Sequence, residues 1–444
     1  MPPPVPTPAV AIPEQYLKPG ATLSLEQVID VALSNNPVTR TAWHQARAAA
    51  ANLGAKKSAY LPDLELDANI TRQKQTSVGS RFVTLQTTYG PSLNLSWLLF
   101  DVGGRAADVA EARNALFAAD WSHDSVIQNL VLQVEIAFYQ YQNAKAQAVA
   151  AEVTLKQAQE SLAAADERHR SGVATIADVL QARTAVSQAE LALETARGSI
   201  QTLRGALATA AGVSPNVPVD VAELPQDVNV EEVAETVEVL IDRAQSQRPD
   251  LAAARFEVLR AQSHVQSVRA EGLPSLSAAG SVSRVYFYNS TGLPFANNYS
   301  GSILFSFPVF TGGRNTYETL EAREQARAAE GQAETLQDQV VLQVWTSYYN
   351  LKTAAQRVKT ARDLLASATQ SQEVASGRYK AGVGSIIDLL VAQSAYANAL
   401  AQEAQARSDW FVALAMLAHD TGSLGPPAAT PPPATPGQSG GAVP

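Results

Sequence analysis

The feature that most constrains this chain is an internal repeat. The stretch FDVGGR, which begins at Phe100, is matched by FTGGR from Phe310, and GVATIADVLQA from Gly172 is matched by GVGSIIDLLVA from Gly382. Both pairs lie about 210 residues apart, close to half of the 444-residue chain. We therefore expect two copies of one structural unit, and any fold proposed for the chain has to accommodate both.

Each copy begins with a helix that is followed by a pair of strands. The helices, expected over 38–58 and 250–271, end at a Leu-Pro pair because proline disfavours a helical residue before it. Apolar and polar residues then alternate within 63–100 and 275–310, which is the period of a β-strand. The alternating apolar positions of the last strand are Ile303, Phe305, Phe307 and Val309. Each copy thus offers two antiparallel strands long enough to span a membrane.

Very long helices are expected after the strands. A Gly-Gly-Arg in each copy precedes a helical pattern over 105–170 and over 315–380, each about 100 Å long at ~1.5 Å per residue. A second helix follows in each copy, and its apolar residues recur every three or four positions, as in a coiled coil. In the first copy these residues are Val179, Ala182, Val186, Ala189, Leu193, Ala196, Ile200, Leu203 and Leu207. Helices of this length suit a thin helical wall rather than a compact globular domain.

The repeat predicts an α+β fold that is mostly α. We expect a Pro-rich N-terminal segment (1–22), a first repeat (23–212), a connector (213–248), a second repeat (249–420) and a disordered Pro/Gly-rich tail (421–444). The connector has a candidate short helix around EEVAETVEVLIDRA. The strands come from 63–100 and 275–310, and the helical part comes from 38–58, 105–211, 250–271 and 315–419.

Composition and motifs exclude several function classes. A net charge of −9 argues against a nucleic-acid partner, and the absence of cysteine removes disulfides and thiolate chemistry. The five histidines have no metal-ligand spacing, no catalytic constellation emerges, and we expect neither a cofactor nor an enzyme. The Gly-Gly-Arg pairs lack the full spacing of a phosphate-binding loop, so we expect Arg105 and Arg314 to pair with nearby acids.

Any membrane span would have to be built from strands, because no run approaches eighteen apolar residues. Four strands in one chain cannot close a barrel, and open edges are not tolerated in lipid. Oligomerisation resolves this: three chains would supply twelve strands, although the pattern alone does not give the number three. The aromatic residues expected towards lipid or its interfaces are Trp97, Tyr286, Tyr288, Phe305 and Phe307.

The order of strand pair, Gly-Gly-Arg and long helical hairpin, given twice, resembles the outer membrane efflux (TolC) family, from Leu25 to Leu417. The resemblance implies a homotrimer whose twelve-stranded β-barrel, four strands from each chain, lies in the bacterial outer membrane and continues into an α-helical barrel that crosses the periplasm. It also implies a passive exit duct of a tripartite efflux pump or type I secretion system. The implied partners are a periplasmic membrane fusion (adaptor) protein, an inner-membrane pump of RND or ABC type, and outer-membrane lipid.

The turns between the long helices contain the candidate site residues. Thr175-x-x-Asp178 and Ser385-x-x-Asp388 resemble a capping box, so both aspartates have a local role as helix caps. The family resemblance adds a compatible role, in which carboxylates at these turns ring and close the periplasmic entrance. It also implies adaptor docking at the two tips, which consist of Arg170, Ser171, Gly172, Val173, Ala174 and Thr175, and of Lys380, Ala381, Gly382, Val383, Gly384 and Ser385.

By position, Asp388 matches the family's gate aspartate, and Tyr379 matches a tyrosine that ties the closed tips together. The alternative for Tyr379 is an ordinary packing aromatic. Gly384 stands where the best-known member has an arginine of the closing network, and Val391 stands where it has a second aspartate. The resemblance therefore implies a weaker or differently built ionic lock in this chain.

The competing function is a soluble periplasmic coiled-coil scaffold or adaptor protein, which would also need long helices. A scaffold has no use for four alternating strands bordered by aromatic residues. The strands therefore favour the channel.

Overall fold

The computed structural model describes residues 22–76, 83–222, 235–288 and 292–424. These residues form α-helices and one four-stranded sheet, and they divide into two compact units. What we call the hairpin unit takes the described residues of 1–41, 124–249 and 337–444. What we call the strand unit takes those of 42–123 and 250–336. No helix in the described part of the chain is long and apolar enough to cross a membrane.

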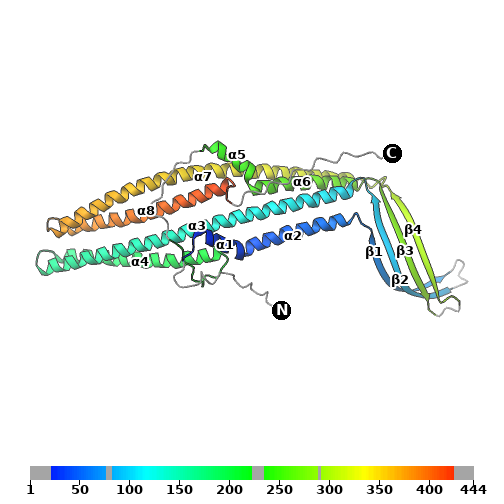
Figure 1. The fold of residues 1–444 in the computed structure, drawn as a ribbon, viewed down its shortest axis with the longest axis horizontal. Helices are drawn as coiled ribbons and strands as arrows, with labels where there is room; N and C mark the ends of the chain where they lie inside the picture. Colours follow the sequence, from blue (N-terminus) through cyan, green and yellow to red (C-terminus); the bar gives the residue numbers. More distant parts are fainter. Residues whose placement is uncertain (1–21, 77–82, 223–234, 289–291, 425–444) are drawn as a thin grey trace. The chain divides into compact units, whose positions relative to one another are not determined.

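The strand unit contains an antiparallel sheet whose strands pair in chain order, β1-β2-β3-β4 (Figure 1). The strands are β1 (Asp63–Thr76), β2 (Val83–Phe100), β3 (Ser275–Phe287) and β4 (Phe295–Ser306). Four helices also contribute to this unit, namely most of α2 (Pro37–Ser58) and α6 (Pro249–Ala270) and the first parts of α3 (Gly104–Arg170) and α7 (Arg314–Lys380).

The last strand is shorter than its alternating pattern predicts. Phe307 and Val309 lie beyond the end of β4 at Ser306, and Tyr288 lies just beyond the end of β3. Pro308 has no backbone N–H to donate to a neighbouring strand, which accounts for the early end of β4. An apolar alternation can therefore run on after the strand has ended.

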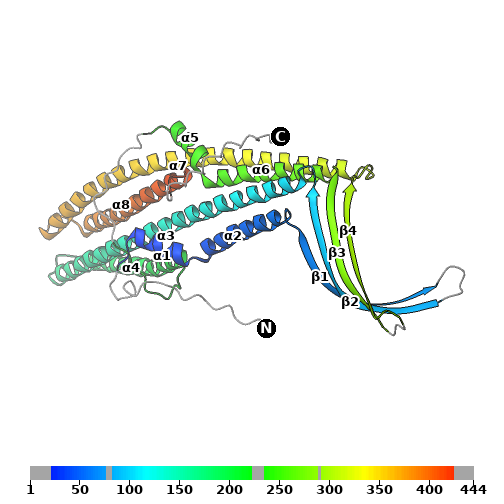
Figure 2. The same ribbon diagram turned by 45° about the vertical axis from the view of Figure 1, so that its right-hand side comes forward.

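The hairpin unit is built from two helical hairpins, α3 with α4 (Ile176–Ala210) and α7 with α8 (Ile386–Asp420). The hairpins lie side by side in Figures 1 and 2. A buried pair of side chains joins them, because Gln393 Nε2 donates to Ser161 Oγ at 2.9 Å. The predicted seam residues Val179, Ala182 and Val186 of α4 are buried against α3.

The main core of the hairpin unit lies where α3 and α4 meet α1 (Leu25–Asn35) and the segment after α4. Its buried side chains include Val28, Leu130, Val134, Phe138, Leu207 and Val221. Lys145 Nζ lies 2.9 Å from Asp220 Oδ1, and Tyr141 Oη donates to the same oxygen at 3.3 Å. Burial raises the pKa of Asp220, but the bonds from Lys145, the Val221 amide and Tyr141 outweigh it, so the pKa lies below its ordinary value. These contacts attach the segment after α4 to α3.

Backbone geometry repeats between the two copies. Before α3 the chain has two successive residues with positive φ, Val102 (49°) and Gly103 (93°). Before α7 the corresponding residues are Gly312 (65°) and Gly313 (85°). A β-branched residue at positive φ is a strained exception, so the first copy carries strain at Val102 where the second has glycine.

A short helix, α5 (Val237–Gln247), lies inside the predicted connector. It has eleven residues, as α1 does. One residue separates α1 from α2, which begins at Pro37, and one residue likewise separates α5 from α6, which begins at Pro249. The short helix expected in the connector is thus confirmed, and the repeated unit in the structure is helix, helix, strand pair and hairpin, with α5 as the counterpart of α1.

Candidate functional site

The register of the sheet separates its side chains into two faces of opposite character. One row across the four strands consists of Leu66, Leu93, Val282 and Tyr299. The adjacent row, whose side chains point to the other face because strand residues alternate, consists of Asp67, Ser92, Ser283 and Asn298. We call these the apolar face and the polar face.

The apolar face is uncovered in the single chain. Leu66 is 76% exposed, Ile303 is 72% exposed and Tyr299 is 88% exposed. Apolar patches of this kind mark a surface that is buried against lipid or against another protein. The sheet also has two open edges, because in the described residues β1 pairs only with β2, and β4 only with β3.

Aromatic residues form a row on the apolar face, level with the end of β3 and the start of β4. The rings of Tyr89 and Tyr286 stack at 5.3 Å, and Phe295 lies 6.1 Å from Tyr286. Two other predicted aromatics, Trp97 and Phe305, belong to the same face by register. The sequence analysis missed Tyr89 and Phe295, although the alternation of the strands could have placed Tyr89.

The predicted Tyr288 and Phe307 lie outside the strands, and both side chains are exposed. Trp97 Nε1 donates to the Tyr60 carbonyl at 3.1 Å, which ties the end of β2 to the residues before β1. The indole ring of Trp97 therefore lies on the uncovered apolar face, while its Nε1–H has a hydrogen-bond acceptor.

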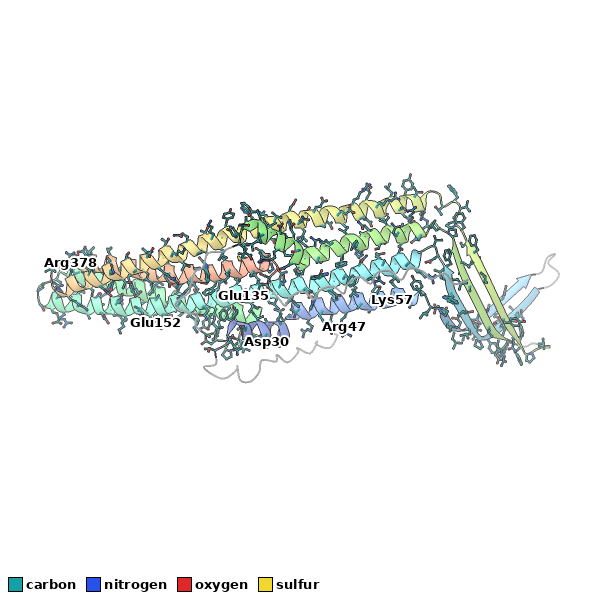
Figure 3. The ribbon with its side chains drawn as sticks, turned by 45° about the horizontal axis from the view of Figure 1, so that its top comes forward. Asp30, Arg47, Lys57, Glu135, Glu152 and Arg378 are labelled. Carbon is teal, nitrogen blue, oxygen red and sulfur yellow. The ribbon has the colours of Figure 1, made fainter. Side chains whose placement is uncertain are left out.

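The two tips have the same backbone geometry. At the first tip the Val173 and Ala174 amides both donate to the Arg168 carbonyl, at 2.8 and 3.1 Å. At the second, the Val383 and Gly384 amides both donate to the Arg378 carbonyl, at 3.0 and 3.1 Å. Gly172 and Gly382 each adopt a positive φ, 74° and 78°, which glycine permits without strain. Arg378 marks the second tip in Figure 3.

The aspartates after the two tips differ in how they are used. Asp178 closes the capping box at Thr175, because its Oδ2 accepts from the Thr175 amide at 2.8 Å and its own amide donates to the Thr175 hydroxyl. At the second tip the Asp388 amide donates to Ser385 Oγ at 3.1 Å, but the described contacts include no bond from the Ser385 amide to the Asp388 carboxylate. Asp388 is exposed, so its carboxylate is available for another role.

Tyr379 is 5% exposed and packs with Ile386 and Leu389. Arg168, at the end of α3, donates from Nη1 to the Tyr379 carbonyl at 2.8 Å, and its guanidinium lies 4.7 Å from the ring centroid. The side chain of Arg168 therefore joins the first hairpin to the second. Sequence reasoning missed Arg168, because a single base at a helix end carries no distinctive pattern.

A groove of about 620 Å³ runs between the two hairpins behind the tips. It is lined by α3, α4 and α8, through residues that include Ala158, Gln181, Ala185, Leu390, Val391 and Gln393. Small and polar side chains dominate the lining.

The two arginines after the glycine pairs, and one of the histidines, contact acidic side chains. Arg105 Nε lies 3.5 Å from Asp101 Oδ2, and Arg314 Nη1 lies 3.4 Å from Glu318 Oε1, as the sequence analysis expected. His264 Nδ1 lies 3.1 Å from Glu111 Oε2. No group of three or more potential metal ligands occurs among the described residues.

Comparison with known proteins agrees with this architecture. A sequence model of the outer membrane efflux protein family matches residues 28–213 and 240–423, most of the chain. Protein CyaE of Bordetella pertussis is 28% identical, over 85% of this chain and 79% of its own length. Outer membrane protein OprJ of Pseudomonas aeruginosa is 27% identical, over 85% of this chain and 79% of its own length.

The solved structure of the Campylobacter jejuni CmeC outer membrane channel is 20% identical and superposes with a TM-score of 0.80, over 95% of this chain and 96% of that one. Because the identity is only 20%, this structural similarity supports the fold alone. Together with the match to most of the chain, these findings show that the chain belongs to the outer membrane efflux protein family.

Proposed function

We propose that this chain is the outer-membrane channel of a tripartite efflux pump or type I secretion system. It conducts substrates passively from the periplasm and pump to the exterior. The proposal depends on the sheet, which has one exposed apolar face, one polar face and two open edges. The chain that contains this sheet belongs to the outer membrane efflux protein family. Such a sheet fits a wall between lipid and a water-filled lumen.

The channel is a homotrimer in this proposal. Because each chain has four antiparallel strands, β4 of one copy can pair antiparallel with β1 of the next, and both open edges disappear. Three copies then give a twelve-stranded barrel, within the range known for outer-membrane barrels. The soluble scaffold lacks support, because it gives the exposed apolar face no role.

The tips carry the gate and the docking surface of the proposed channel. We assign Asp178, Tyr379 and Asp388 to the periplasmic gate and residues 170–175 and 380–385 to contact with an adaptor protein. Of the three gate residues, Asp388 has the carboxylate least committed to local hydrogen bonds. The best-known family member has an arginine of the closing network at the position of Gly384. In this chain we assign that closing role to Arg168, which contacts Tyr379.

Four measurements test this function. The full-length protein should require detergent for extraction, sediment as a trimer, and give discrete conductance steps in planar lipid bilayers. Extraction by salt alone, with no conductance, would support the soluble scaffold instead. Co-purification with an adaptor and an inner-membrane pump would identify the system that the channel serves.

A further inference from the structure

Charged residues are segregated between the two faces of the sheet. The acids of the described strands, Asp63, Glu65 and Asp67, alternate with leucines of the apolar face and so lie on the polar face. The bases of the same strands, Arg72, Lys74 and Arg284, all lie on the apolar face. This is unexpected, because a charge on a lipid-facing surface is costly near the middle of a membrane.

The bases lie at one end of the apolar face. β1 and β3 both run from a helix towards the loop that ends the strand, and all three bases fall in the half nearer the loop. Arg72 and Arg284 also occupy corresponding places in the two copies, since Leu64 and Ile70 of β1 match Leu276 and Val282 of β3. The repeat therefore puts an arginine at the same point of β1 and of β3, although the register of the sheet places Arg284 four residues nearer the helix end of the strands than Arg72.

The side chain of Arg284 is oriented by its neighbours on the same face. Its Nε donates to Asn297 Oδ1 at 2.8 Å, and its guanidinium lies 5.1 Å from the centroid of the Phe295 ring. Phe295 belongs to the aromatic row with Tyr89 and Tyr286. Aromatic rows of this kind lie at the boundary between the hydrocarbon and the headgroups. By register, Arg284 lies one same-face row to the helix side of this aromatic row, and Arg72 lies one row to its other side, so the two arginines flank the aromatic level.

We propose that Arg72, Lys74 and Arg284 form a site for the phosphates of an anionic glycolipid in the outer leaflet. This inference rests on the proposed function, because the loop end of the sheet faces outwards only if the helices lie in the periplasm. Arginine binds phosphate through paired N–H donors, and the apolar rows below the bases accommodate the acyl chains. No acid lies on the same face of the strands to compete for the bases. In a trimer the site recurs around the barrel.

The occupant follows from charge complementarity. The surface combines fixed positive charge, aromatic rings and an exposed apolar band, so its ligand must carry negative charge and acyl chains together. Bisphosphorylated lipid A meets this description, whereas free phosphate lacks the apolar part and a zwitterionic phospholipid lacks the net charge.

The test uses the full-length protein in a non-ionic detergent, with bound lipid A measured by native mass spectrometry. The triple variant Arg72→Gln, Lys74→Gln, Arg284→Gln should bind bisphosphorylated lipid A at least about tenfold more weakly than the wild type, because each base near an anionic surface contributes several-fold. The matched control Arg323→Gln, Arg327→Gln, Lys352→Gln removes the same three charges from α7 and should bind as the wild type does.

Three results would overturn the inference: equal binding by the triple variant, equal binding of dephosphorylated lipid A by the wild type, or full displacement of lipid A by inorganic phosphate. Conductance of the wild type in phosphatidylcholine bilayers separates this inference from the proposed function. A conducting protein that does not bind lipid A leaves the channel intact and removes the site. A protein without conductance removes the channel itself.

Discussion

Arg168 Nη1 donates a 2.8 Å hydrogen bond to the Tyr379 carbonyl, and the same guanidinium lies 4.7 Å from the centre of the Tyr379 ring. The two residues come from different hairpins, so the contact has to break or stretch if the tips separate. We therefore interpret it as a latch within one chain. Its partner groups are a backbone carbonyl and an aromatic face.

Arg168→Gln should weaken the closed state. A hydrogen bond from a charged donor contributes about 1.5–3 kcal/mol, and about 1.4 kcal/mol is a factor of ten, so its loss should raise the ratio of open to closed channels at least about tenfold. Single-channel open probability measures the change. Arg378→Gln is the matched control, because Arg378 is the corresponding, exposed residue of the second copy. Equal effects of the two variants would remove Arg168 from the latch.

Asp388 and Asp178 should respond differently to the same substitution. Asp388→Asn should reduce block of the single-channel current by divalent cations, because three carboxylates at a constriction attract cations. Asp178→Asn should instead lower stability by about 0.5–1 kcal/mol, because it disturbs a closed capping box. An unchanged block in Asp388→Asn would exclude this residue from the gate.

Asp220 should make the hairpin unit sensitive to acid. Its pKa is lowered in the folded protein, so its contribution to stability is fully present above the unfolded-state pKa and is lost as pH falls through the folded pKa, below the ordinary 3.8. Asp220→Asn should therefore show a smaller fall in thermal midpoint than the wild type in this acidic range. Identical pH profiles would show that the ion pair with Lys145 contributes nothing measurable.

The faces of β4 should differ in tolerance to charge. Ile303→Arg places a cation on the apolar face and should destabilise the membrane-inserted protein by up to about 2–4 kcal/mol. Ser302→Arg, one residue away on the polar face, should be nearly neutral. Urea unfolding from lipid vesicles measures both. Equal losses would contradict the assignment of the two faces.

Val102→Gly should stabilise the protein by roughly 1 kcal/mol, because it relieves a β-branched residue held at positive φ. Gly312→Val, the reverse change at the corresponding place in the second copy, should destabilise it. Thermal unfolding of the two variants provides the comparison. A loss of stability in Val102→Gly would show that packing of Val102 outweighs the backbone strain.

The long elements could be predicted because their periods are maintained over many residues. The predicted helices over 105–170 and 315–380 differ by one residue at the start from α3 and α7. The strands followed from alternation, but the end of β4 did not, because Phe307 and Val309 continue the apolar pattern past the point where Pro308 prevents pairing. The short helix expected around EEVAETVEVLIDRA is confirmed as α5, whereas α1, which also has eleven residues, was not predicted because so short a helix offers few turns of periodicity.

The contacts at the tips were less predictable than the tips themselves. The two turns could be predicted from a glycine followed by Ser/Thr-x-x-Asp, because glycine permits a positive φ and the Ser/Thr and Asp side chains hydrogen-bond to nearby backbone amides. The pairing of Arg168 with Tyr379 joins residues 211 positions apart and depends on how two hairpins pack. Asp178 and Asp388 likewise differ in the hydrogen bonds of their carboxylates, which the S/T-x-x-D pattern does not distinguish.

The central claim is that β4 of one chain pairs with β1 of the next, and disulfide trapping tests it directly. The protein has no cysteine, so Asn69→Cys in β1 can be combined with Asn298→Cys, Ser300→Cys or Ser302→Cys in β4 without side reactions. Within one sheet β1 and β4 are three strand spacings apart, about 14 Å, which is too far for a disulfide. We predict that at least one pair gives a covalent trimer on a non-reducing gel, and monomers at all three pairs would contradict the account.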